Sequence, residues 1–133
     1  MHLIVCIDDR YGMSFCGRRL SRDKAVTEHI LHRCTGHKLW IHPASMQLFA
    51  DGTVLADPEF LTKAEAGDYC FAETTPLPER FDHLESVILY HWNRAYPSTT
   101  KFPKELLHAM HLVHTEDFPG NSHDKITMEQ YKL

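Results

Sequence analysis

The most constraining feature of the sequence is the run at residues 86–92, which reads Ser-Val-Ile-Leu-Tyr-His-Trp. Apolar side chains fill consecutive positions of this run, whereas a strand with one solvated face would alternate apolar and polar residues. A polar turn follows it, and Phe102-Pro103 ends the segment. The run therefore predicts a strand covered on both faces, which is typical of parallel sheets with helices on both sides.

The remainder of the chain up to Pro103 alternates short apolar runs with segments of helical spacing. The expected strands lie at residues 2–7, 38–42, 53–56, 69–72 and 87–92. The expected helices lie between them, at residues 22–34, 43–49, 59–64 and 76–84. This order predicts an α/β fold with a mainly parallel sheet flanked by helices.

The pattern changes after Pro103. Residues 111–115 and 126–133 alternate in the manner of strands and are separated by a polar segment that contains Pro119 and Gly120. We expect the chain to close with a C-terminal antiparallel hairpin. No repeat or linker interrupts residues 1–133, so the sequence predicts one domain.

Three local signals mark the starts of two expected helices and the position of one turn. Ser21 is the candidate N-cap of the first helix, and Pro43 suits the first position of the second. Asp51-Gly52 predicts a turn before the third strand. Residues 8–17, with Gly12 and Gly17, are expected to form a long loop.

Composition narrows the classes of function. The 133 residues carry a formal net charge of -4, which gives no general attraction to nucleic acid or to anionic membranes. No apolar stretch reaches the roughly 20 residues that a membrane-spanning helix needs. The opening segment lacks the basic start of a signal peptide, so we expect a cytoplasmic protein. The four cysteines have neither CxxC nor zinc-type spacing, which favours free thiols.

The pieces, in this order, resemble dihydrofolate reductase over nearly the whole chain, in a shortened form. Residues 4–18 are similar to that family's first strand and its substrate loop, which runs from an apolar strand through an acid and a turn to Gly-Arg. Residues 86–103 look like its sixth strand and following loop, which also ends in Thr-x-Phe-Pro. Residues 111–118 and 126–133 look like its closing antiparallel pair. The resemblance implies the fold of that family.

The departures from this resemblance imply that NADPH is not bound in the usual way, and we expect no cofactor. A Gly-Gly pair lets the family's backbone approach the cofactor phosphates, and here it falls on Ala72 and Glu73. The family's Gly-Arg-x-Thr motif corresponds to residues 42–45, which lack the arginine. Its Pro-Trp pair corresponds to Leu20 and Ser21, and one further strand is missing between residues 49 and 53.

Short bacterial proteins of this kind often carry the label ribonuclease Z. That class needs a two-metal His-x-His-x-Asp-His cluster. The nearest pieces, His108 with His111 and His29 with His32, have a different spacing. We therefore assign no metal site.

The resemblance predicts a ligand-binding cleft under the loop at residues 8–21. Cys6, Phe71 and Tyr90 would point into it from three adjacent strands. Asp23 or Arg22 would face it from the first helix, and Glu73 would lie at its former cofactor end. The full set of candidate ligand-binding residues is Cys6, Asp8, Arg22, Asp23, Phe71, Glu73 and Tyr90.

Several of these residues have a simpler structural interpretation. Asp8 and Asp9 follow a strand, where paired acids could bind a metal or act in acid-base chemistry, but an aspartate there more often starts a turn. Arg18, Arg19, Arg22 and Lys24 form a basic cluster that could hold a phosphate or could simply be solvated. Cys6 is more readily a small core residue than a nucleophile.

The leading hypothesis is a dihydrofolate-reductase-like domain that has lost NADPH binding and binds a small molecule or a protein partner. The alternative is an enzyme with new acid-base chemistry in the same cleft, built on Asp8, Asp23, Glu73 and Tyr90, which predicts a carboxylate with a raised pKa. A hydrolase acting on nucleic acid is a third possibility that would need a metal, and a nucleic-acid partner is the least expected.

Overall fold

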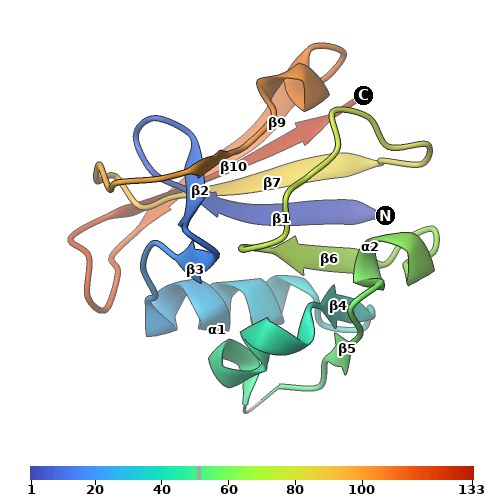
Figure 1. Cartoon of the computed structure of the whole chain (residues 1–133), viewed down its shortest axis with the longest axis horizontal. Coiled ribbons are helices and arrows are strands. Elements are labelled where there is room, and N and C mark those ends of the chain that lie inside the picture. Colours follow the sequence, from blue (N-terminus) through green and yellow to red (C-terminus); the bar gives the residue numbers. More distant parts are fainter. Residues whose placement is uncertain (51) are drawn as a thin grey trace.

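The computed structural model describes residues 1–50 and 52–133. Its helical segments are α1 (Lys24–Arg33), the 3₁₀ helix η1 (Pro43–Phe49), α2 (Phe60–Lys63) and the 3₁₀ helix η2 (Lys104–Leu107). Its strands are β1 (His2–Ile7), β2 (Gly12–Phe15), β3 (Arg18–Arg19), β4 (Leu39–Ile41), β5 (Leu55–Ala56), β6 (Tyr69–Ala72), β7 (Ser86–His91), β8 (Thr100–Lys101), β9 (His111–Phe118) and β10 (Ile126–Lys132). Figure 1 shows their arrangement.

Seven strands form the main sheet, in the order β5-β4-β6-β1-β7-β10-β9. The pairs among β5, β4, β6, β1 and β7 are all parallel, and β10 and β9 add an antiparallel hairpin at one edge. β1 and β7 are the central strands, and both are almost entirely buried. The predicted α/β fold, with its mainly parallel sheet and closing hairpin, is confirmed.

Two apolar cores lie on the two faces of this sheet. α1 and η1 cover one face, where Ile30 and Phe49 pack against alternate residues of β1 and β7 such as Ile4 and Ile88. The other face is covered by α2, η2 and the long connection between β6 and β7. Because β1 and β7 have a core on each side, they carry apolar residues at consecutive positions.

Residues 76–84 do not form the helix that the sequence predicted. The structure has turns and bends there. Pro76 and Pro78 explain the difference, because a proline disfavours helical geometry in the residue before it and donates no N–H. Leu77, Phe81 and Leu84 still pack against the second core. Their spacing therefore arises because these side chains are buried, although the segment is not helical.

The expected loop at residues 8–17 contains a strand, β2, which forms a small second sheet in the order β3-β2-β8. β2 pairs with β3 as a tight hairpin and with β8 from the segment after β7. Cys16 and Gly17 both have positive φ at the hairpin turn, where glycine is favoured. This small sheet holds residues 12–19 across the carboxyl end of the main sheet.

Two of the three local signals can be compared with the structure. α1 begins at Lys24, and its N-cap is Asp23 instead of the predicted Ser21, with the Asp23 carboxylate accepting the backbone N–H of Ala25 at 2.9 Å. Pro43 does begin η1. The predicted turn at Asp51-Gly52 includes Asp51, which lies outside the described residues.

None of the helices within residues 1–50 and 52–133 has the length and apolar character needed to cross a membrane.

Candidate functional site

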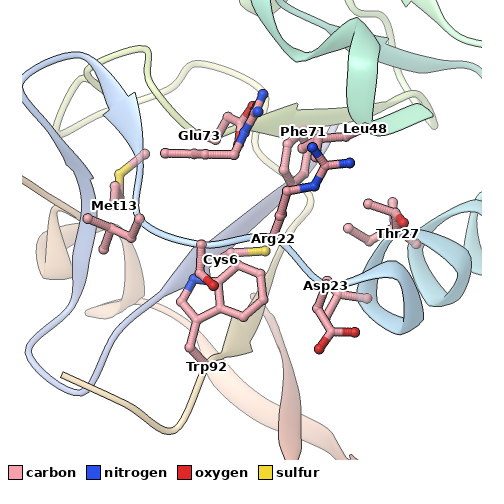
Figure 2. Close-up of a pocket in the computed structure, with 14 residues that line it drawn as sticks. Cys6, Met13, Arg22, Asp23, Thr27, Leu48, Phe71, Glu73 and Trp92 are labelled. Carbon is pink, nitrogen blue, oxygen red and sulfur yellow. Dashed lines mark hydrogen bonds and ion pairs between the residues drawn. The ribbon is translucent and has the colours of Figure 1, made fainter. Parts of the chain in front are cut away.

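The candidate site is a pocket where β1 and β6 end, between the small sheet and the start of α1 (Figure 2). Open parallel sheets bind their ligands outside the carboxyl ends of the strands, so the position is the expected one. The cavity volume is about 20 Å³, enough for a single water molecule. Its walls are formed by Cys6, Met13, Arg19, Leu20, Ser21, Arg22, Asp23, Val26, Thr27, Ile30, Leu48, Phe71, Glu73 and Trp92.

Five of the seven candidate residues line this pocket: Cys6, Arg22, Asp23, Phe71 and Glu73. The other two, Asp8 and Tyr90, are not part of its wall. Their side chains make other contacts, which account for their burial. The four residues proposed for acid-base chemistry therefore do not converge on one cavity.

Asp8 organises the turn that follows β1. Its carboxylate accepts the backbone N–H groups of Arg10 at 2.9 Å, Gly12 at 2.6 Å and Tyr96 at 2.9 Å. Burial acts to raise the pKa of Asp8, but these three hydrogen bonds outweigh it and lower the pKa. A Cβ at Gly12 would lie 2.9 Å from the carboxylate, so this approach requires glycine. The turn-forming interpretation of Asp8 fits this geometry.

Tyr90 faces α1 and the hairpin. Its hydroxyl lies 2.7 Å from Nδ1 of His29, and Nε2 of the same ring lies 2.8 Å from Glu116. The His29 ring also stacks on Phe118, with centroids 4.4 Å apart. Burial raises the pKa of Tyr90, so its hydroxyl remains protonated and available as a donor. This network fastens α1 to β9.

Cys6 lies in the pocket wall but is not prepared for nucleophilic chemistry. Burial raises the pKa of its thiol well above the usual value, and the nearby negative charges of Glu73 and Asp23 raise it further. A thiolate is the reactive form of cysteine. Cys6 therefore serves as a small apolar wall residue.

Glu73 forms a buried cluster with Arg19 and Ser45, which we call the Glu73 cluster. The guanidinium of Arg19 donates to the carboxylate through Nε at 3.0 Å and through a terminal nitrogen at 2.9 Å. The Ser45 hydroxyl donates at 2.6 Å, and the same Arg19 nitrogen reaches the carbonyl of Ala44 at 3.3 Å. The cluster connects β3, η1 and the end of β6, and it closes one end of the pocket.

Asp23 is the centre of a second buried cluster, which we call the Asp23 cluster. Besides Ala25, its carboxylate accepts the backbone N–H groups of Asn121 at 2.8 Å, Ser122 at 2.8 Å and His123 at 3.1 Å. Nδ1 of His123 lies 2.9 Å from the same carboxylate. Burial acts to raise the pKa of Asp23, but the hydrogen bonds dominate and hold it far below its usual value of 3.8. Asp23 is therefore ionised at neutral pH.

The raised carboxylate pKa that the acid-base hypothesis predicts is not found at Asp8 or Asp23. Both residues have lowered pKa values, because each accepts several backbone N–H groups. A carboxylate of this kind is ionised near neutral pH, so it has no proton to donate as a general acid. The lowered pKa values argue against Asp8 and Asp23 in that role.

Arg22 is the cation of the pocket wall that is not part of either cluster. Figure 2 shows its side chain extending toward Phe71 and Leu48, whereas the carboxylate of Asp23 points away from them. Arg22 is exposed and makes no ion pair with any carboxylate in the part of the chain that the structure describes. It also lines a second, wider hollow of about 470 Å³ between α1, η1 and the segment at Asn121 and Ser122.

Within residues 1–50 and 52–133, no three or more His, Cys, Asp or Glu side chains are grouped so that they could hold a metal ion. His29 contacts Tyr90 and Glu116, while His32 is exposed on the next turn of α1. His111 and His114 lie on β9.

Sequence reasoning missed the partners of the two carboxylates. Ser45 and His123 carried no signal of their own, because they are about 28 and 100 positions away from Glu73 and Asp23. Arg19 was included only as one member of a basic cluster. The charge of Glu73 could have predicted a partner, because a buried glutamate requires a cation nearby.

Comparison with known proteins identifies the fold. No protein-family model matches the sequence, and no curated protein matches it. The structure is similar to dihydrofolate reductase from Enterococcus faecalis, solved with NADP(H) and RAB-propyl, with a TM-score of 0.68 and 11% sequence identity. The match covers 98% of this chain and 94% of that chain. The chain therefore has a dihydrofolate-reductase-like fold, and the ribonuclease Z label has no support.

Proposed function

We propose that this protein is a small-molecule-binding domain that does not bind NADPH in the manner of dihydrofolate reductases. The observation that carries the proposal is the Glu73 cluster. The resemblance aligns Glu73 with a glycine that lets the backbone approach the cofactor phosphates. Here the position holds a carboxylate with a side-chain exposure of only 7%.

The electrostatics of the Glu73 cluster support this proposal. A buried carboxylate at the end of β6 repels a diphosphate placed beside it. Arg19, the nearest cation, already donates twice to Glu73 and once to Ala44. Ser45, at the start of η1, also donates to Glu73 and so is not available to a phosphate. Arg19 and Ser45, the donors beside Glu73, are thus both engaged within the protein.

The walls of the pocket indicate the class of ligand. Val26, Ile30, Phe71 and Trp92 present apolar surface, and Arg22 adds an exposed guanidinium at the edge. This combination favours a small, mainly apolar molecule that carries one carboxylate or phosphate group.

Binding of such a ligand requires the pocket to open. Its present volume of about 20 Å³ is far below the several hundred Å³ of an ordinary ligand site. Separation of Arg19 from Glu73 would move β3 and enlarge the cavity.

The cofactor part of the proposal is tested by titrating the protein with NADPH and by measuring reduction of dihydrofolate. We expect no saturation at micromolar NADPH and no hydride transfer. Saturable binding together with turnover would refute the proposal. The matched variant is Glu73→Gln, which removes the charge and keeps the shape; we expect it to bind NADPH more tightly than the wild type does.

The ligand part is tested by a thermal-shift screen with pterins, nucleotides and small aromatic acids, because a ligand of the folded state raises the melting temperature. We expect stabilisation by aromatic acids, and loss of that stabilisation in Arg22→Gln. Arg18→Gln is the matched control, since Arg18 is exposed and lies outside the pocket wall. If Arg18→Gln and Arg22→Gln lose the same amount of thermal stabilisation by aromatic acids, the ligand does not bind at Arg22.

A further inference from the structure

Ser21, His123 and Asp23 form a continuous hydrogen-bonded chain at one end of the pocket. Oγ of Ser21 lies 3.1 Å from Nε2 of His123, and Nδ1 of His123 lies 2.9 Å from the carboxylate of Asp23. The order is hydroxyl, imidazole and carboxylate, with each pair at hydrogen-bond distance. This is the order in which an imidazole, oriented by a carboxylate, can act as a base toward a serine hydroxyl.

The charge of Asp23 decides which nitrogen of His123 carries a proton. Asp23 is ionised, so its oxygens only accept hydrogen bonds. Nδ1 of His123 must therefore be the protonated nitrogen that donates to Asp23. In the neutral ring this leaves a lone pair on Nε2, directed toward the hydroxyl of Ser21.

The orientation of the His123 ring is fixed by its surroundings. The ring stacks on Trp92, with centroids 4.8 Å apart and planes inclined by 24°. Its own backbone N–H donates to Asp23, so the residue is held at both main chain and side chain. The side chains of His123 and Asp23 are 3% and 0% exposed. An imidazole held in this way needs no rearrangement before it accepts a proton.

Ser21 brings the hydroxyl of this hydrogen-bonded chain to the pocket, whose wall also includes Asp23. Ser21 is partly exposed and forms part of the pocket wall, which His123 does not. The sequence predicted Ser21 as the N-cap of α1, a role that would occupy its hydroxyl, but Asp23 takes that role. Among residues 1–50 and 52–133, His123 is the one hydrogen-bond partner of the Ser21 hydroxyl.

From this geometry we propose that Ser21 is a nucleophile for acyl transfer, with His123 as its general base and Asp23 as the residue that orients His123. Oγ of Ser21 attacks the carbonyl carbon of an ester, and its proton moves to Nε2 of His123. The bond to the alcohol then breaks, and the alcohol leaves with that proton. Water attacks the acyl-serine in the same way, which releases the acid and restores Ser21.

An ester of a small acid is the substrate that requires the least opening of the pocket. The closed cavity holds one water molecule, which suits the hydrolytic step, and each additional acyl carbon needs further opening. Arg22 follows Ser21 directly in the chain and lines the same wall.

The hydroxyl of Tyr96 also contacts His123, the proposed general base. It lies 3.1 Å from Nε2 of His123, so it competes with Ser21 for the same lone pair. Removal of this hydroxyl leaves Nε2 to Ser21 alone. The mechanism therefore predicts that Tyr96→Phe increases the reactivity of Ser21.

The test is covalent labelling of the folded protein with a small alkyl fluorophosphonate, followed by peptide mass spectrometry. We expect a single labelled residue, Ser21, and no labelling of Ser21→Ala. Asp23→Asn should decrease the labelling rate by at least a hundredfold, whereas Tyr96→Phe should increase it severalfold. Failure of the wild-type protein to label, or equal labelling of the exposed Ser122, would overturn the proposal.

Two further measurements keep the outcome unambiguous. Circular dichroism of each variant shows whether it is folded, and His123→Gln, which keeps hydrogen-bonding groups at that position, should be folded and unlabelled. The inference uses the pocket of the proposed function, but the probe requires neither Arg19 nor a bound ligand. Absence of labelling with retained aromatic-acid binding contradicts only the acyl-transfer step; labelling without such binding contradicts only the ligand.

Discussion

Glu73 and Asp23, the centres of the two clusters, lie at two ends of one pocket (Figure 2). Each is a buried carboxylate beside a basic side chain, Arg19 or His123. They differ in their partners. Asp23 accepts four backbone N–H groups, from Ala25, Asn121, Ser122 and His123. Glu73 is held by the side chains of Arg19 and Ser45.

This difference separates a fixed end of the pocket from a movable one. Backbone donors are held by the chain itself, so Asp23 cannot leave them without unfolding the 119–124 turn. Arg19 is a flexible side chain on the two-residue strand β3, and its side chain is 23% exposed. The Glu73 cluster can therefore open for a ligand, while the Asp23 cluster keeps Ser21 and His123 in place.

The largest effect is expected for Asp23→Asn. The amide cannot accept from every donor, and it leaves buried N–H groups without a partner. We expect a decrease of about 3 kcal/mol in the free energy of unfolding, measured by urea denaturation. Asp124→Asn, at an exposed position in the same segment, should change it by less than about 0.5 kcal/mol. Similar decreases in the free energy of unfolding in both variants would show that the Asp23 end of the pocket is not held by the Asp23 carboxylate.

Acidification should remove most of the difference in free energy of unfolding between the wild type and Asp23→Asn. The pKa of Asp23 is lowered in the folded state, so its contribution is fully present above the unfolded value of 3.8 and is lost as the pH falls toward the folded value. The stability difference between wild type and Asp23→Asn should be constant at neutral pH and shrink below about pH 4. Other carboxylates titrate in both proteins and cancel. A difference that stays constant down to pH 2 would show that the charge of Asp23 is not what stabilises the turn.

Gly120→Ala tests the approach of the turn to Asp23. A Cβ at this position would lie 2.5 Å from the carbonyl oxygen of His123 and 2.7 Å from the Asp23 carboxylate. The turn would have to move, at an expected cost of about 2 kcal/mol in the free energy of unfolding. Asn121→Ala, which keeps its backbone N–H, should cost less than about 0.5 kcal/mol. Equal stability of Gly120→Ala and wild type would show that the turn is movable.

The smallest effect is expected for Glu73→Gln. The variant loses the ion pair with Arg19 but retains groups that can bond to Arg19 and Ser45, so the expected loss is about 1 kcal/mol. Hydrogen exchange should become faster at residues 16–20 and remain unchanged at residues 119–124. Glu79→Gln, at an exposed position, should change neither segment. A loss greater than that of Asp23→Asn would reverse the assignment of fixed and movable ends.

Much of the fold could be predicted because burial on both faces leaves a direct trace in the sequence. β1 and β7 are apolar at consecutive positions, and the alternation in residues 111–133 marks the hairpin. The predicted helix at residues 76–84 was wrong because Leu77, Phe81 and Leu84 have the spacing of a buried helical face, although Pro76 and Pro78 prevent the helix.

The site was predictable only in part. The resemblance to dihydrofolate reductase predicted Cys6 and Phe71 in the cleft, with Arg22 or Asp23 facing it from the first helix. All four residues line the pocket in the structure. The resemblance also predicted Tyr90 in the cleft, but its hydroxyl contacts His29 on α1 and the residue is not part of the pocket wall.

The sequence by itself determined most of the alternation of strands and helices along the chain, the mainly parallel sheet and the place of Glu73 directly after the strand at residues 69–72. These properties follow from local periodicity and from the position of single residues along the chain. Only the tertiary structure decided which groups the buried carboxylates meet. Hydrogen bonds from Arg19 and Ser45 to Glu73, and from His123 to Asp23, join distant segments, and no local pattern encodes them. Because burying a charge is costly without such partners, these contacts define the two ends of the pocket.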